Sequence, residues 1–434
     1  MRVGGGDPVS DILGQNSQPS VSGTEDCLNL AVFTPHLRPR KLMPVMVFIH
    51  GGGFILGSYT AYGSNYQLDK DDIVLVHIHY RLSSLGFLCL NSAETSSNVG
   101  LLDQVLGLQW VQKHIKYFGG DPGQVSLAGE SAGSASVTYH LTSHLSRGLF
   151  HRAVAMSGSN TAQWALNTRP HLFTRRLAQI LKCSVEDTVT MVQCIKYHRT
   201  AEQIVIAQDM LRRENFAGAE TLGSESAPCV DHNFSPPRLC QIKVPSHLQL
   251  YSLFRLSSDI KNSVPLLVSS TRDEGSAFVA IAVKNFFNVN MKQLSRRPGY
   301  FHHQFIIDIL QLLRVPQATD PQFIKFIKQL YFLPQELGTL QGVLPGLAAI
   351  MGRYMIKQPS YQFARLNAQL SPTYLMSFEY SGENSFFSFL VPADVEDVIE
   401  PGVAHSDDLL YLFFTGIFDL GNIIFFLKNQ HLII

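Results

Sequence analysis

Short runs of apolar residues alternate along the chain with segments in which apolar residues recur every three or four positions. The runs are rich in valine, isoleucine and leucine, which is typical of buried strands. We expect strands at residues 28–33, 45–49, 73–80, 125–128, 153–156, 264–268 and 374–378. The helical spacing is clearest over residues 101–118 and stops at Gly119 and Gly120. Strands that alternate with helices predict an α/β fold with a mostly parallel sheet and helices on both faces.

The remaining stretches carry weaker patterns. Residues 164–228 and 279–370 predict mainly helices and loops, whereas residues 1–24 are rich in glycine, serine and proline and predict a loop. The most apolar stretch, residues 409–434, is interrupted by Asp419 and Lys428, which leaves pieces too short to cross a bilayer. We therefore expect no membrane span, and residues 1–7 show no apolar core of a signal peptide.

The segment 129–133 has the pattern Gly-x-Ser-x-Gly, with the strand 125–128 before it and a helical stretch after it. This context is typical of a nucleophile elbow, a turn so tight that side chains at both flanking positions would collide. The turn holds Ser131 in a strained conformation that exposes its hydroxyl. The helix that follows directs its N-terminal N–H groups toward the same place, where they favour a developing negative charge.

Polar residues follow three further strands of the expected sheet. The glycine run at 51–53 follows strand 45–49, Glu274 follows strand 264–268, and His405 lies in a loop beyond strand 374–378. In an open α/β sheet the carboxyl ends of the strands meet at one edge, where ligands bind. The chain order Ser, acid, His therefore predicts a catalytic triad, with Asp273 and Asp407 as competing candidates for the acid.

Two other sites are weaker hypotheses. The glycine run could hold a phosphate group, but no Gly-Lys-Ser or Gly-Lys-Thr follows it. His77 and His79 share one face of a strand and could bind a metal ion, but the sequence offers no third ligand nearby. We therefore expect neither a metal nor another cofactor.

Composition excludes some classes of partner. The chain has 434 residues, 34 basic and 34 acidic, and its basic residues form no tract. A balanced, scattered charge gives no reason to expect binding to nucleic acid or to an anionic membrane.

The six cysteines leave several pairings open. Cys183 and Cys194 bracket a short polar segment and could form a local disulfide, and Cys229 and Cys240 have the same separation. Cys27 and Cys89 lie in or beside apolar runs and are expected to be small buried side chains. A disulfide would indicate an oxidising compartment.

Several motifs in order resemble the type-B carboxylesterase/cholinesterase family of α/β-hydrolases. The matching residues are 25–30, 50–54, 98–104, 118–122, 129–133, 273–276 and 402–405, so that the resemblance covers about residues 25–413. Residues 129–165 are most similar to arthropod carboxylesterases.

The resemblance implies a serine hydrolase that cleaves small-molecule carboxylic esters without a cofactor. Ser131 matches the nucleophile, Glu274 the orienting acid and His405 the general base. A serine hydroxyl becomes a good nucleophile when a neighbouring imidazole accepts its proton, and the carboxylate fixes the imidazole tautomer.

The family pattern also implies supporting roles. The backbone N–H groups of Gly52, Gly53 and Ala132 match the oxyanion hole. Trp164 matches a wall of the acyl pocket, with ordinary core packing as the alternative, and Glu130 is expected to contribute to substrate binding.

Further positions follow from the resemblance alone. It implies an ion pair between Arg81 and Asp103 and a disulfide between Cys183 and Cys194. It also implies secretion, although no signal peptide is visible in this chain.

The sequence departs from the family in three ways. Ala277 stands where cholinesterases carry an aromatic residue for a quaternary ammonium group, which favours a general carboxylesterase. Family members begin well before Glu25, and the cysteine that would pair with Cys27 is missing. Residues 414–434 match nothing in the family. We therefore expect three segments: an irregular segment 1–24, a hydrolase domain 25–413 truncated at both ends, and an apolar tail 414–434.

Three hypotheses remain. The first is an ester hydrolase that works through an acyl-enzyme. The second is a catalytically inactive relative that binds partners, as the adhesion members of the family do, and the third is a truncated product that does not fold. Because Ser131, Glu274 and His405 are all present, the sequence favours the first.

Overall fold

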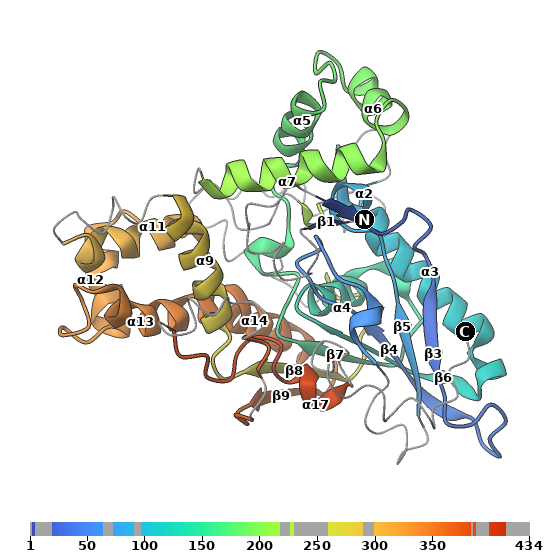
Figure 1. The fold of residues 1–434 in the computed structure, drawn as a ribbon. Helices are drawn as coiled ribbons and strands as arrows, with labels where there is room; N and C mark the ends of the chain where they lie inside the picture. The colour runs from blue at the N-terminus through green and yellow to red at the C-terminus, as the bar shows by residue number, and fades with distance from the viewer. Residues whose placement is uncertain are drawn as a thin grey trace.

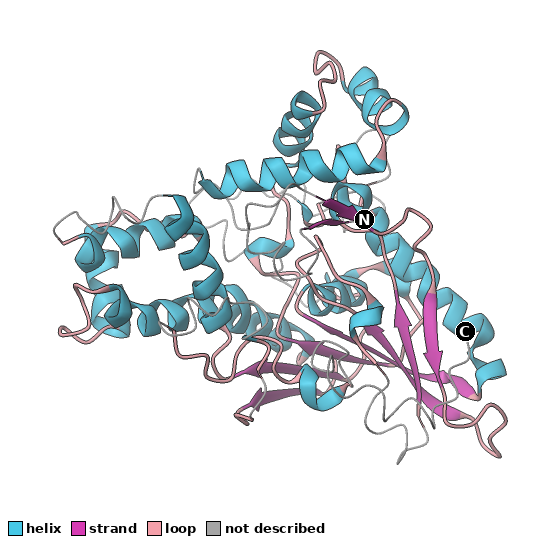
Figure 2. Ribbon diagram, in the orientation of Figure 1, coloured by secondary structure: helices cyan, strands magenta, loops and turns pink. Residues whose placement is uncertain are grey.

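The computed structural model describes residues 2–4, 20–63, 73–90, 97–217, 226–229, 259–289, 299–382, 385–387 and 399–413. Its centre is a seven-stranded sheet with helices packed on it, and the longer helices form separate groups around the sheet (Figures 1 and 2). The strand order is β3-β5-β4-β6-β7-β8-β9. The strands are β3 (Leu30–Phe33), β4 (Met43–Ile49), β5 (Val74–Ile78), β6 (Gly120–Glu130), β7 (Arg152–Met156), β8 (Leu266–Thr271) and β9 (Thr373–Phe378).

The sheet is parallel except at its first edge. β3 runs antiparallel to β5, whereas every pair from β5–β4 to β8–β9 is parallel. Side chains alternate between the two faces: Val45, Val47 and Ile49 pack into the main core, and Phe48 packs into a smaller cluster on the other face. The mostly parallel α/β sheet predicted from the apolar runs is thus confirmed.

The helices lie in three groups (Figure 1). Next to the sheet are α2 (Ser83–Phe87), α3 (Val99–His114), α4 (Ala132–Thr142) and the short α17 (Leu409–Leu412). Another group holds α9 (Gly275–Val289), α11 (Phe305–Leu312), α12 (Pro321–Tyr331) and α13 (Leu340–Gly352), and α14 (Gln358–Asn367) joins this group to β8 and β9 of the sheet. Among the residues that the structure describes, no helix is long and apolar enough to span a membrane.

The third group, α5 (Pro170–Ile180), α6 (Thr188–Tyr197) and α7 (Ala201–Ala217), forms a satellite with its own apolar cluster. The Cys183–Cys194 disulfide, with a Cα–Cα distance of 5.8 Å, closes the segment between α5 and α6. The local pairing implied by the resemblance is therefore present in the structure.

Two expectations about the other cysteines are wrong. Cys229 pairs with Cys89, 140 residues away, rather than with Cys240, which lies outside the described residues. Cys89 is consequently not a free buried thiol. The side chain of Asn98 accepts a hydrogen bond from the N–H of Cys229 and donates one to its carbonyl, both at 2.8 Å, so that this part of the chain is held at two points.

The N-terminal expectation needs a smaller correction. Within residues 1–24, expected to form a loop, β1 (Arg2–Gly4) pairs antiparallel with β2 (Ser20–Ser22). A two-stranded ribbon this short has no apolar pattern of its own in the sequence. Residues 414–434 lie outside the described residues.

The ion pair between Arg81 and Asp103 is confirmed. Both Asp103 oxygens accept from the guanidinium at 2.8 Å, and one also accepts from the Arg81 N–H at 3.0 Å. The Asp103 side chain is 5% exposed, whereas that of Arg81 is 40% exposed. The carboxylate therefore connects α3 to the segment after β5.

Replacing Asp103 with alanine should lower the free energy of unfolding by about 1–3 kcal/mol, because the partly buried N–H and guanidinium of Arg81 lose their acceptor. Urea denaturation followed by circular dichroism measures the change. The control is Asp121→Ala, which removes an exposed carboxylate bonded only to its neighbours Gly123 and Gln124 and should cost less than about 0.5 kcal/mol. Equal losses in the two variants would contradict the expectation.

Candidate functional site

Ser131 lies on the sharp turn between β6 and α4. Its φ of 56° and ψ of −117° are unusual for a residue with a side chain. The turn leaves no room on either side: a Cβ at Gly129 would lie 2.4 Å from the Gly133 carbonyl oxygen, and a Cβ at Gly133 would lie 2.0 Å from that of Ile49. Glycine is thus required at both flanking positions, as the motif predicted.

The glycine run after β4 lies against this turn. A Cβ at Gly51 would be 3.1 Å from the Ser131 Cβ. Gly52 and Gly53 have φ values of 107° and 62°, which glycine adopts without strain. Among the described residues, no hydrogen bond occupies the N–H groups of Gly52 and Gly53. Ala132 opens α4, where the N–H has no acceptor within the helix.

Glu274 and His405 are in direct contact. The Nδ1 atom of His405 lies 2.6 Å from Glu274 Oε2, and both side chains are buried. The other oxygen of Glu274 accepts from the Ser157 hydroxyl at 2.6 Å and from the Thr271 N–H at 2.9 Å. These bonds fix the carboxylate, which favours the tautomer that carries its proton on Nδ1.

A second carboxylate contacts the same imidazole. Glu130 Oε1 lies 3.2 Å from His405 Nε2 and also accepts from the Ser406 hydroxyl at 2.6 Å. Burial opposes a charge on His405, but the carboxylates of Glu130 and Glu274 outweigh it and raise the pKa of the imidazole to about 9. The two carboxylates therefore favour the protonated imidazole, whose Nε2 faces Glu130.

Asp408 adds a third buried carboxylate near this pair. Among the described residues, neither of its carboxylate oxygens has a hydrogen-bond partner. Burial, together with the charges of Glu130 and Glu274, raises the pKa of Asp408 to about 7. Neither the contact of Glu130 with His405 nor the burial of Asp408 is predicted by the sequence pattern. The position of Glu130 beside Ser131 is the only signal that could have suggested the former.

The two competing acids do not contact the imidazole. Asp273 Oδ2 accepts from the Val403 N–H at 2.8 Å. Asp407 accepts from the Ala404 N–H at 2.7 Å and from the Phe386 N–H at 2.6 Å. Of the three carboxylates weighed from the sequence, only Glu274 reaches His405.

The remaining candidates lie near the glycine run. Trp164 is mostly buried, its Nε1 donates to the Met355 carbonyl at 3.0 Å, and its ring centroid lies 6.4 Å from that of Phe54. The His77 ring is buried among aromatic side chains. The nearby His79 contacts Ser58 and Asn29, each at 3.0 Å. Within the described ranges, no group of three or more His, Cys, Asp or Glu side chains is arranged to hold a metal ion.

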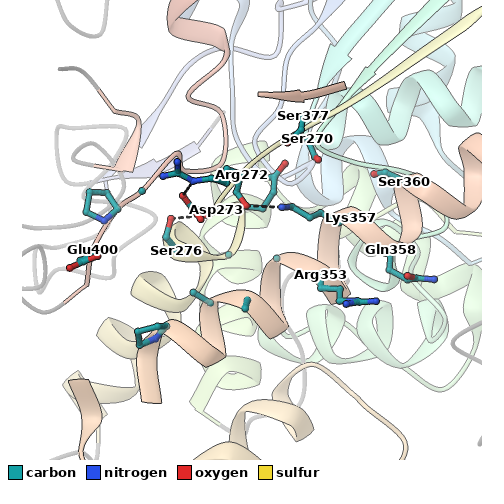
Figure 3. Close-up of a pocket in the computed structure, with 18 of the residues that line it drawn as sticks. Ser270, Arg272, Asp273, Ser276, Arg353, Lys357, Gln358, Ser360, Ser377 and Glu400 are labelled. Carbon is teal, nitrogen blue, oxygen red and sulfur yellow. Dashed lines mark hydrogen bonds and ion pairs between the residues drawn. The ribbon is translucent and has the colours of Figure 1, made fainter. Parts of the chain in front are cut away.

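A separate pocket lies behind the loop that carries Glu274 (Figure 3). Its lining includes Asp273, Ser276 and Lys357, but neither Ser131 nor His405. Glu274 also lines this hollow, so the hollow touches the site on the side away from Ser131 and His405 only through that residue's segment.

Comparisons with known proteins show the family of the chain. The model of the carboxylesterase family matches residues 8–432. Esterase E4 of Myzus persicae is 31% identical over 405 residues, which cover 91% of this chain and 68% of that protein. Juvenile hormone esterase of Tribolium castaneum is 31% identical over 415 residues, with shares of 92% and 66%. Cocaine esterase of Oryctolagus cuniculus is 39% identical over 191 residues, with shares of 44% and 36%.

The chain thus spans 66% to 68% of the length of the first two relatives. The family match extends over nearly the whole chain and includes the glycine run, the elbow, Glu274 and His405. The sheet order and the tight turn at Ser131 are those of an α/β-hydrolase. On these grounds the chain belongs to the carboxylesterase family.

Proposed function

We propose that the protein is a serine hydrolase that cleaves small-molecule carboxylic esters through an acyl-enzyme. The observation that carries this proposal is the 2.6 Å contact between Glu274 and His405 beside the strained turn at Ser131. An imidazole with Nδ1 fixed by a buried carboxylate is suited to accept a proton at Nε2. The family membership and the names of the relatives support ester hydrolysis.

In the first half of the reaction, the Ser131 oxygen attacks the ester carbonyl carbon, and its proton passes to His405 Nε2. The N–H groups of Gly52, Gly53 and Ala132 stabilise the negative oxygen of the tetrahedral intermediate. His405 then donates the proton to the alcohol oxygen as the carbon–oxygen bond breaks. In the second half, a water molecule attacks the acyl-enzyme with the same groups in the same roles.

This mechanism requires a small change at His405. In the structure His405 Nε2 contacts Glu130. Before attack, the imidazole must therefore lose the proton on Nε2 and turn this nitrogen toward Ser131. Glu130 and Trp164 are proposed to border the bound ester, Glu130 beside the imidazole and Trp164 beside the acyl group. The two disulfides are compatible with an oxidising, extracellular location, and we propose secretion on that basis.

Replacing Ser131 with alanine should lower kcat for a short-chain aryl ester by at least about 10⁴-fold, because the acyl-enzyme can no longer form. A fluorophosphonate probe should label the wild-type chain at Ser131, as mapped by mass spectrometry, and leave the variant unlabelled. Ser134→Ala is the matched control, since its hydroxyl donates only to the Gly158 carbonyl. Unchanged turnover in the Ser131 variant would refute the proposal.

The pH dependence should follow the raised pKa of His405. Only the neutral imidazole can accept the serine proton, so kcat/KM should rise with pH and level off near the pKa of about 9. Glu130→Gln removes one of the carboxylates that hold the proton, so that its profile should level off at a lower pH. Stopped-flow or steady-state profiles from pH 5 upward measure this, and coincident profiles would show that Glu130 does not control the imidazole.

A further inference from the structure

We propose that Asp273 is a positioning residue that holds the loop carrying His405, residues 402–408, against Glu274. The effect of Asp273 on catalysis rests on the proposed function, whereas the effect of Asp273 on the contact between Glu274 and His405 does not. Asp273 immediately precedes Glu274 in the chain, so that one segment supplies both the acid and the group that holds the base in place.

Two hydrogen bonds join Asp273 to Val403. The Asp273 N–H donates to the Val403 carbonyl at 2.9 Å, and the Val403 N–H donates to Asp273 Oδ2 at 2.8 Å. Val403 is fully buried and lies two residues before His405. Asp273 is adjacent to Glu274, and Val403 lies two residues from His405. This pair of hydrogen bonds therefore sets the position of the imidazole relative to Glu274.

The Asp273 carboxylate is itself held in place. Arg272 Nε donates to Oδ2 at 2.8 Å, and the Asp273 carbonyl accepts from the Ser276 hydroxyl at 2.9 Å, as Figure 3 shows. Gly402 has a φ of 61°, and a Cβ there would lie 2.2 Å from Asp273 Oδ2. The loop therefore approaches the carboxylate so closely that only glycine fits.

Asp407 holds the loop from the other side. It accepts from the Ala404 N–H at 2.7 Å and from the Ser385 hydroxyl at 2.9 Å. The two residues that precede His405 are thus each held by a different carboxylate. A loop fixed at these two adjacent positions can keep a buried imidazole within 2.6 Å of Glu274.

A general structural role would give a different result from a positioning role. Asp273 has a side chain that is 37% exposed, and its removal leaves the bond from its own N–H to Val403 intact. We therefore expect the fold to survive the loss of the carboxylate while the loop shifts. A shift of the order of 1 Å at a reacting group can cost about 10²-fold in rate.

The kinetic test compares Asp273→Ala with Asp273→Asn in the full chain, using a short-chain aryl ester. The alanine variant should lose about 10- to 100-fold in kcat with KM changed less than about threefold, because the imidazole is displaced while the ester contacts remain. The asparagine variant keeps an amide oxygen for the Val403 N–H and should recover most of kcat. Wild-type kcat in the alanine variant, or no recovery in the asparagine variant, would overturn the proposal.

A second measurement does not depend on turnover. The Nδ1 proton shared with Glu274 should give a far-downfield proton resonance, which should persist in Ser131→Ala and be lost or broadened in Asp273→Ala. If the wild type shows the resonance but no turnover, the proposed function fails while this inference stands. If the resonance is unchanged in Asp273→Ala, the inference fails even for an active enzyme.

Asp320→Ala is the matched control. Asp320 also holds backbone N–H groups, those of Gln322 and Phe323 at the start of α12, but contacts neither catalytic loop. Its loss should lower stability without changing kcat. If Asp273→Ala does not fold, Asp273→Ser replaces it in both measurements. The short serine hydroxyl cannot reach the Val403 N–H, so the kinetic and the resonance outcomes given for Asp273→Ala apply to it unchanged.

Discussion

The close contact between the turn at Ser131 and the end of β4 is the constraint on which the rest of the site depends. Gly133 packs directly under the Ile49 carbonyl, so β6 must end, turn and become α4 within a few residues beside β4. The same contact brings the glycine run after β4 next to Ser131. A single packing distance therefore places both the nucleophile and the proposed oxyanion donors.

The electrostatics of the site follow from how deeply its charges are buried. Three carboxylates, those of Glu130, Glu274 and Asp408, lie around one imidazole with little access to water. Charges in such a place interact much more strongly than they do in solution. The arrangement favours the positively charged imidazole over the neutral one, which is the form that the proposed mechanism needs before attack.

Much of this could be predicted from the sequence because backbone patterns are local. The apolar runs located the strands of the central sheet, and the glycines at 129 and 133 located the elbow. The contact of Glu274 with His405 could be expected because both follow strands whose carboxyl ends share one edge of the sheet. Family resemblance chose Glu274 over Asp273 and Asp407, a choice that spacing alone left open.

The failures concern contacts that depend on side-chain direction or on distant partners. Spacing does not reveal that the carboxylate of Glu130 turns toward His405, since the residue is adjacent to Ser131 but its side chain could turn either way. Equal separations suggested that Cys229 would pair locally, but cysteine connectivity is not encoded in separation. The short ribbon of β1 and β2 has too few residues to show a period.

The Cys89–Cys229 disulfide separates the residues of the site into those inside a covalent ring and those outside it. The covalent ring it closes contains the elbow, α3, α4 and the satellite helices, but neither Glu274 nor His405. Cross-linking a loop this long lowers the conformational entropy of the unfolded chain. In the chain-entropy view this stabilises the folded state by about 4–5 kcal/mol. The segment that carries Ser131 therefore lies inside a covalently closed ring, and Glu274 and His405 lie outside it. The disulfide limits the freedom of the unfolded Ser131 segment but places no covalent restraint on how far Glu274 and His405 lie from it.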